Sequence, residues 1–214
     1  MIRAALAACL AVAALPAEAQ QGTLPYNAYV QQAAAQSTPP FVGYDIPHLP
    51  QEEPLWCWAA AAQQAIGWVN AGRAPTQCAI VALAHGIDVN TCCADRTGVC
   101  ARTGEIPAIA ALVRRFGGQA YETATVPRDP REVYRILQEG GTLLIRLRPE
   151  KHVDAAGIRH MIVVTGLEWL RLPNGRLDAT LHYNDPLGDG QRAVDFDEIV
   201  GFFEQALIVK QRGS

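Results

Sequence analysis

The sequence predicts an α+β fold, with helices in the first half of the folded part and a sheet in the second. The chain has 214 residues, half of them apolar, which is enough for one domain with a substantial core. After residue 118, segments rich in Val, Ile, Leu and aromatic residues alternate with turns. The expected strands are 142–147, 158–167, 177–183, 192–196 and 206–210. Helices followed by strands, instead of alternating with them, are typical of an α+β domain.

The expected helices carry recognisable start and stop signals. The first begins near Cys57 in an alanine-rich segment that has high helix propensity and no breaker before Gly67. Another has Pro107 in its first turn and two glycines after its end, and a later one begins at the capping pair Asp129-Pro130. The helices after the first are 77–85, 106–116 and 129 to about 138, with a short strand at 119–126.

The N-terminus has the pattern of a secretory signal peptide. A cationic start, an apolar run, a proline and a small-x-small site ending at Ala19 follow one another in residues 1–19. We therefore expect cleavage near Ala19/Gln20 and a secreted or periplasmic mature chain. Residues 20–47 are expected to be an extended or partly disordered arm, which either is solvated or lies across a cleft. The folded domain is predicted for residues 48–214.

Charge and hydropathy argue against two classes of partner. The net charge is −3 and no basic run is longer than the pair Arg114-Arg115, so neither nucleic acid nor an anionic membrane surface is expected to bind. No stretch approaches about 18 consecutive apolar residues, so stable membrane insertion is not expected. Peptide, protein and small-molecule substrates remain open, and nothing in the sequence sets the oligomeric state.

The cysteines predict one free thiol and two disulfides. Cleavage of the signal peptide leaves five cysteines in an oxidising compartment, so one lacks an intramolecular partner, and Cys57 is the one expected to stay free. The adjacent Cys92 and Cys93 are not expected to bond to each other. Two pairings remain: Cys78–Cys92 with Cys93–Cys100, or Cys78–Cys93 with Cys92–Cys100. Either pairing would staple the polar loop 95–103.

Cys57 occupies a position that favours a reactive thiol. It stands where a proline-containing loop enters the alanine-rich helix, so free backbone N–H groups and the positive end of the helix dipole favour the thiolate. Six residues upstream, Gln51 carries a side-chain amide that can point to the same place. The Gln51 amide and the Cys57 backbone N–H would together form an oxyanion hole.

This segment resembles the active-site segment of papain-like cysteine peptidases. In that superfamily a Gln, five residues and then Cys-Trp open a long helix, as Gln51 and Cys57-Trp58 do here. The continuation into Ala59 and Ala60 is similar to the bacterial branch, which includes double-glycine leader peptidases and avirulence-effector cysteine proteases.

The resemblance spans about residues 48–210 and implies the architecture of the α+β fold. Its N-terminal helical half would carry the active-site helix, packed on a C-terminal antiparallel sheet half with a cleft between them. Leu55 and Trp56 stand where papain has Gly and Ser, so a papain-type substrate preference is not implied.

A histidine and an acidic residue would complete a catalytic triad. Among the five histidines, His160 opens an apolar strand downstream of Cys57, after an expected loop at 152–157. The run His-Met-Ile-Val-Val-Thr-Gly is similar to the His segment of the bacterial branch. In that branch an Asp followed by Pro orients the histidine, which implies Asp185. Papain uses an Asn for this role, which keeps Asn184 as the alternative.

The turn between the two strands decides whether His160 reaches Asp185. If the Asn174-Gly175 pair formed a two-residue hairpin, His160 would face Asp189 instead. A turn centred near Leu172-Pro173, or a wider loop from about 170 to 176, would bring His160 opposite Asp185. The proline within that loop cannot donate to a strand ladder, which favours the wider loop.

These residues predict a secreted cysteine peptidase that acts on a peptide or protein substrate. Cys57 attacks the carbonyl carbon, His160 transfers the proton and Asp185 orients the imidazole. Gln51 would help to stabilise the oxyanion, and no metal or cofactor is needed. The alternatives are a non-peptidase Cys-His hydrolase or acyltransferase (amidase or transglutaminase-like), and a catalytically silent binding module on the same fold.

Overall fold

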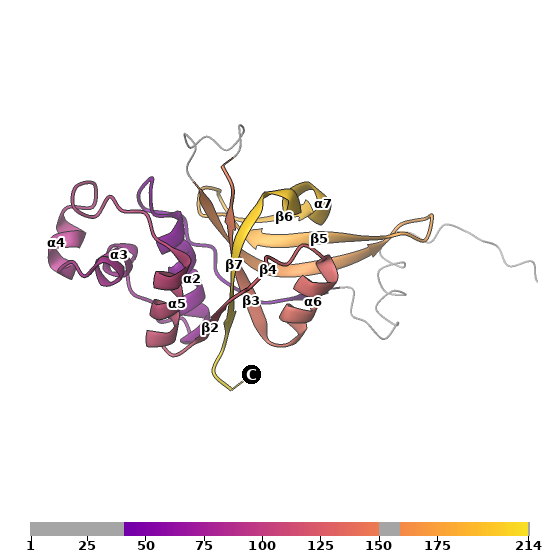
Figure 1. The fold of residues 1–214 in the computed structure, drawn as a ribbon, viewed down its shortest axis with the longest axis horizontal. Coiled ribbons are helices and arrows are strands. Elements are labelled where there is room, and N and C mark those ends of the chain that lie inside the picture. Colours follow the sequence, from indigo (N-terminus) through magenta and orange to yellow (C-terminus); the bar gives the residue numbers. More distant parts are fainter. Residues whose placement is uncertain (1–40, 150–158, 214) are drawn as a thin grey trace, which may run out of the picture.

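The computed structural model describes residues 41–149 and 159–213 and has two halves (Figure 1). Helices α2 to α5 gather at one end, and a seven-stranded antiparallel sheet forms the rest. This arrangement confirms the predicted α+β class with a helical N-terminal half. The predicted signal peptide, most of the predicted arm and the predicted loop 152–157 lie outside the described residues.

The helical half contains the three predicted helices and one that was not predicted. It consists of α2 (Cys57–Val69), α3 (Gln77–His85), α4 (Val89–Ala94) and α5 (Ile106–Arg115). Local signals explain the bounds of α3, since the Thr76 side chain caps its first turn and Gly86 adopts the left-handed conformation at its end. The short α4 is capped by Asp88 and carries the two adjacent cysteines.

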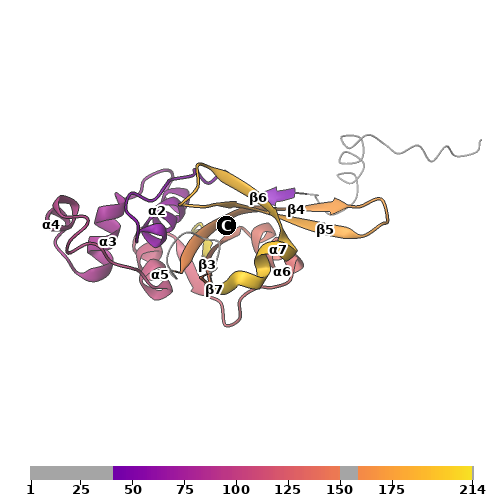
Figure 2. The ribbon, with the colours of Figure 1, turned by 90° about the horizontal axis from the view of Figure 1, so that it is seen from above.

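The sheet half contains every predicted strand and two helical segments that were not predicted. Its strands are β1 (Phe41–Gly43), β2 (Gln119–Glu122), β3 (Gly141–Leu147), β4 (His160–Arg171), β5 (Leu177–Asn184), β6 (Gln191–Asp195) and β7 (Phe203–Lys210). Their order is β2-β7-β3-β4-β5-β6, and β1 pairs with β4. The helical segments are the predicted α6 (Pro130–Gln138) and the unpredicted α7 (Phe196–Ile199) and η1 (Val200–Phe202). The β4–β5 hairpin extends away from the body (Figure 2).

The central strands are buried on both faces, which explains why they appear in the sequence as unbroken apolar runs. Leu144, Met161 and Val163 pack in one core with α2 and α5. Ile145 and Ile162, which alternate with them, pack in a second core with α6 and α7. A strand that is covered on both sides needs apolar residues at every position. The sheet therefore holds α2 on one face and is covered by α6 on the other.

The domain begins earlier than the predicted boundary at residue 48. Strand β1 pairs with β4, and Gly43 approaches it so closely that a Cβ atom would lie 2.5 Å from the Thr165 carbonyl oxygen. Ile46 is buried with only 3% of its surface exposed. Residues 41–47 thus belong to the folded domain and not to the arm. A three-residue strand gives no alternating pattern, so the sequence did not reveal it.

The β4–β5 turn is neither the two-residue hairpin nor the loop from about 170 to 176 that would have brought His160 opposite Asp185. Arg171 pairs with Leu177, and residues 172–176 form the connection, closed by a bond from the Leu172 N–H to the Arg176 carbonyl of 2.8 Å. Asn174 and Gly175 therefore do not form a two-residue hairpin on their own.

The predicted pairing of His160 opposite Asp185 is wrong. The register shifts at Thr165, after which Val163 pairs with Asn184, the last residue of β5. His160 itself pairs with Leu147 of β3. Asp185 instead lies in a turn just past the strand end, and this turn brings its side chain to the His160 ring. A bulge of one residue carries no sequence signal that could have predicted this route.

Candidate active site

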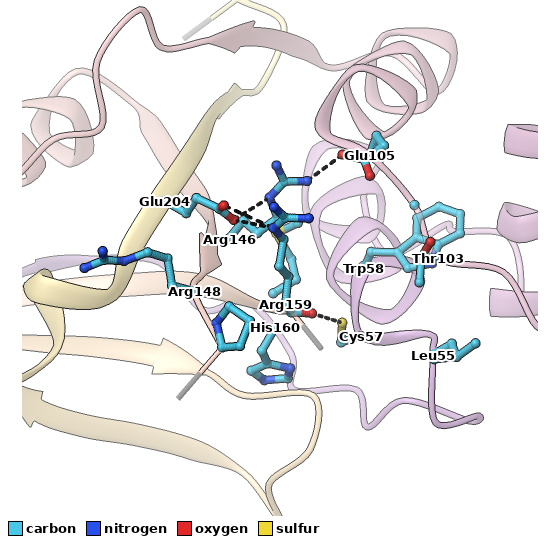
Figure 3. Close-up of a pocket in the computed structure, with 13 residues that line it drawn as sticks. Leu55, Cys57, Trp58, Thr103, Glu105, Arg146, Arg148, Arg159, His160 and Glu204 are labelled. Atoms are coloured by element: carbon cyan, nitrogen blue, oxygen red, sulfur yellow. Dashed lines mark hydrogen bonds and ion pairs between the residues drawn. The ribbon is translucent and has the colours of Figure 1, made fainter. Parts of the chain in front are cut away.

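Cys57 is the first residue of α2 and faces the sheet half (Figure 3). The preceding Trp56 makes no side-chain capping bond, so it leaves the N–H groups at the positive end of the helix dipole without a side-chain cap. Cys57 is the one free cysteine of the described residues, and only 7% of its surface is exposed. Its Sγ lies 3.8 Å from the carbonyl oxygen of Arg159, the residue before His160.

His160 lies at the start of β4 between the cysteine and a carboxylate. Its Nε2 donates to Asp185 Oδ1 at 2.6 Å, which leaves Nδ1 as the ring nitrogen for Cys57. Burial would lower the pKa of His160, but hydrogen bonds to Asp185 and Cys57 outweigh burial and raise it from 6.5 to about 9. The imidazole is therefore protonated at neutral pH and can pair with a thiolate.

Asp185 is held as a carboxylate by several donors. Burial would raise its pKa, but the hydrogen bond from His160 and the positive charge of that imidazolium outweigh burial and lower it. The Leu187 N–H, which donates to Oδ1 at 2.9 Å, and the Arg192 guanidinium, 3.7 Å from Oδ2, act in the same direction. The arrangement fixes which ring nitrogen of His160 faces Cys57.

Asn184, the alternative third residue, is placed away from His160. Its side-chain nitrogen donates to the Ile46 carbonyl and to Gln64 Oε1, both at 2.8 Å, and only 1% of its surface is exposed. It joins the end of β5 to α2 and to the segment that follows β1. The structure thus brings Asp185, and not Asn184, against the imidazole.

The segment 46–51 connects the two halves beside the site. Gln64 of α2 donates to the Leu49 carbonyl at 3.0 Å, and His48 Nε2 lies 2.9 Å from the Asp185 carbonyl oxygen. No role could be predicted for His48, because its partner is a backbone atom 137 residues away. Through these bonds, the turn that carries Asp185 is tied to the helix that carries Cys57.

Gln51 lies in the loop before Cys57, and its side-chain amide bonds to the backbone of that loop. Its Nε2 donates to the carbonyls of Glu53 at 2.9 Å and Pro54 at 3.0 Å. Its Oε1 is buried and has no partner among the described residues. The backbone N–H of Gln51 donates to Pro186 at 2.9 Å, so the loop touches the turn of Asp185. The oxyanion role of Gln51 stays a prediction.

The disulfides take the second of the two pairings left open. Cys78 bonds to Cys93 and Cys92 bonds to Cys100, with Cα atoms 5.0 and 5.3 Å apart. The stapled loop is held against the tryptophans on either side of Cys57. Trp56 Nε1 donates to the Cys100 carbonyl at 2.9 Å, and Trp58 Nε1 donates to the Arg102 carbonyl at 3.0 Å.

A cavity of about 600 Å³ opens beside Cys57 and His160 (Figure 3). Its helical side is formed by Leu55, Trp58 and residues 103–105, and its sheet side by residues of β3, β4 and β7. Charged residues that the sequence analysis did not single out line it: Glu105, Arg146, Arg148, Arg159 and Glu204. Arg146 was detectable in principle, because it is a charged residue within an apolar strand.

The described residues gather no cluster of three or more His, Cys, Asp or Glu side chains that could hold a metal ion. No helix among residues 41–149 and 159–213 has the length and apolar character to cross a membrane. The candidate site therefore consists of the side chains of Cys57, His160 and Asp185 and the amide groups near them.

One protein family and several solved structures are similar to this chain. The model of the Peptidase C70 family, described as papain-like cysteine protease AvrRpt2, matches residues 40–204. No curated protein gives a significant match. One similar solved structure is a double glycine motif protease from an AMS/PCAT transporter in complex with its leader peptide, with 17% identity, a TM-score of 0.47 and coverage of 79% of this chain and 94% of that one. Another is the SERA5 proenzyme from Plasmodium falciparum, with 10% identity, a TM-score of 0.48 and coverage of 79% and 64%.

The family match covers well over half of the chain and includes Cys57, His160 and Asp185. The matched region also contains every helix and strand that positions these residues except the last part of β7. The chain therefore belongs to the AvrRpt2 family of papain-like cysteine proteases.

Proposed function

We propose that this protein hydrolyses peptide bonds with a triad of Cys57, His160 and Asp185. The observation that supports it most is the position of His160, whose two ring nitrogens serve Asp185 and Cys57. Because the pKa of His160 is raised to about 9, the imidazolium is present at neutral pH beside the sulfur. A thiolate paired with an imidazolium is the reactive form of a cysteine nucleophile.

The proposed reaction proceeds through a thioester. The Cys57 thiolate attacks the carbonyl carbon of the substrate, and the Nδ1 proton of His160 passes to the leaving amine as the C–N bond breaks. Neutral His160 then takes a proton from a water molecule that attacks the thioester. Cleavage of the C–S bond restores the thiolate and the imidazolium. Asp185 keeps the imidazole in one orientation throughout.

The oxyanion of each tetrahedral intermediate would be stabilised by two N–H groups. The Cys57 backbone N–H is the first, and it lies in an uncapped first turn. The Gln51 amide is the second, and it reaches the cleft once its bonds to the Glu53 and Pro54 carbonyls give way. Each donor contributes on the order of 3 kcal/mol to such a transition state.

The protein is proposed to act outside the cytoplasm. The pattern of residues 1–19 is that of a cleaved signal peptide, and two disulfides pair every cysteine of the described residues except Cys57. N-terminal sequencing of the exported protein should begin near Gln20. Retention of residues 1–19 on the mature chain contradicts the proposal.

The function is tested with single substitutions and a matched histidine control. Wild-type protein should cleave casein or a peptide library, and Cys57→Ala and His160→Ala should lose that activity. His182→Ala should keep it, because His182 pairs with Glu168 at 3.4 Å and is placed in no catalytic step. Iodoacetamide should label Cys57 alone in the non-reduced wild type. Cleavage by Cys57→Ala, or hydrolysis of cell-wall fragments without any peptide cleavage, would overturn the proposal.

A further inference from the structure

Charged side chains line the cavity beside Cys57, and Arg146 is the most buried of its arginines. Arg146 extends from β3 with about a tenth of its side chain exposed, and it reaches both halves of the protein. Its Nη1 bonds to Glu105 of the helical half at 2.5 Å, and its Nε lies 3.2 Å from Glu204 of β7. A buried guanidinium that carries several donors is a strong recognition group for a carboxylate.

The donors of Arg146 are not all satisfied. Its Nη2 makes no hydrogen bond in the part of the chain that the structure describes. Its Nε makes no well-aligned hydrogen bond despite its closeness to Glu204. Figure 3 shows this guanidinium at the cavity, between Glu105 and Glu204. Because Nε is itself buried, Nη2 is the nitrogen of Arg146 through which an incoming acceptor would bind.

The partners of Arg146 are also poorly placed to neutralise the cavity. The Glu105 side chain is 67% exposed, so a competing carboxylate can displace it into solvent. Glu204 is shared, because Arg159 lies 2.9 Å from the same carboxylate. Arg148 bonds to the Gly201 carbonyl, which does not neutralise its charge, and it has no carboxylate partner among the described residues. Three arginines thus face two glutamates around one cavity.

We propose that this cavity binds an acidic side chain, Asp or Glu, of the substrate close to the bond that is cleaved; this inference rests on the proposed peptidase function. The carboxylate would be bound by Arg146 Nη2 and by Arg159, whose side chain is 56% exposed at the rim. A lysine would add a cation to a cavity with excess positive charge. An apolar side chain would remove water from these charges without replacing its hydrogen bonds.

The test is a cleavage-site profile on peptides. Wild-type protein is incubated with a peptide library, and the residues on both sides of the cleaved bond are identified by mass spectrometry. One position should be enriched in Asp and Glu. Matched peptides with Glu, Gln, Leu or Lys at that position should then show kcat/KM highest for Glu, by roughly tenfold or more over Gln.

Substitutions of Arg159 at the cavity rim test whether this cavity sets the preference, and they leave the buried Arg146 unchanged. Arg159→Gln should reduce the Glu-to-Gln ratio of kcat/KM, and Arg159→Glu should invert the preference to Lys. Arg176→Gln is the matched control, since Arg176 is also exposed and ion-paired, with Asp178 at 2.9 Å in the β4–β5 hairpin. Circular dichroism of each variant checks that it is folded.

The outcomes separate this inference from the proposed function. A wild-type protein that cleaves peptides with no preference for Glu over Gln, or an Arg159→Glu variant whose preference is unchanged, overturns the cavity assignment alone. A wild-type protein that cleaves no peptide and whose Cys57 is not alkylated overturns the proposed function and this inference with it.

Discussion

The helical half and the sheet half position their functional groups by different means. In the helical half, Cys57 follows from local features: a loop, an alanine-rich helix, and a neighbouring loop closed by two disulfides. In the sheet half, His160 and Asp185 are 25 residues apart and meet because of strand register, a bulge and a turn. The nucleophile thus depends on local structure and covalent links, whereas its acid–base partners depend on non-local pairing.

Asp185→Asn in the sheet half should have the largest effect. We expect kcat/KM to fall roughly 10²–10⁴-fold, because an amide no longer holds the imidazolium of His160 in place. Loss of the Asp185 charge removes a cause of the raised pKa of His160. Wild-type activity should therefore decline as pH rises through about 9, where His160 loses its proton, and the variant should decline at lower pH. The measurement is kcat/KM as a function of pH.

Asn184→Ala is the neighbouring control for this prediction. It leaves the Ile46 carbonyl and Gln64 Oε1 without their donor, which should lower the free energy of unfolding by about 1–3 kcal/mol. It should leave the decline in activity near pH 9, because the contact between Asp185 and His160 remains. If Asn184→Ala moves that decline as far as Asp185→Asn does, Asp185 is not the group that sets the pKa of His160.

The same difference between the halves explains what could be predicted from the sequence. The bounds of α3 and α6 follow from capping residues such as Thr76 and Asp129, which act on the turn beside them. Cys57 could be placed for the same reason, since a helix start is a local event. The order of helices and strands was sufficient for the α+β class.

The route by which His160 meets Asp185 could not be predicted, because it depends on atoms far apart in the sequence. The register shift at Thr165 changes the pairing of Val163 and Val164 with β5, and no residue pattern marks it. The ion pairs of Arg146 with Glu105 and Glu204 are also non-local, 41 residues apart in the first case. Whether two residues far apart in the sequence meet in space depends on the pairing of the whole sheet, which local sequence patterns do not specify.

Removal of the Cys92–Cys100 disulfide should have a smaller effect, confined to the helical half. The double substitution Cys92→Ala and Cys100→Ala opens a link between residues 8 apart and should lower the free energy of unfolding by about 2 kcal/mol. Alanine is chosen because both cysteines are fully buried, where a serine hydroxyl would add a desolvation cost. Activity should fall only a few-fold, because the loop loosens its hold on Trp56 while the contact between His160 and Asp185 persists. Chemical unfolding and the pH profile of kcat/KM measure the two effects separately. A decline in activity that stays near pH 9 supports independent halves, whereas a decline at lower pH shows that the stapled loop also sets the environment of His160.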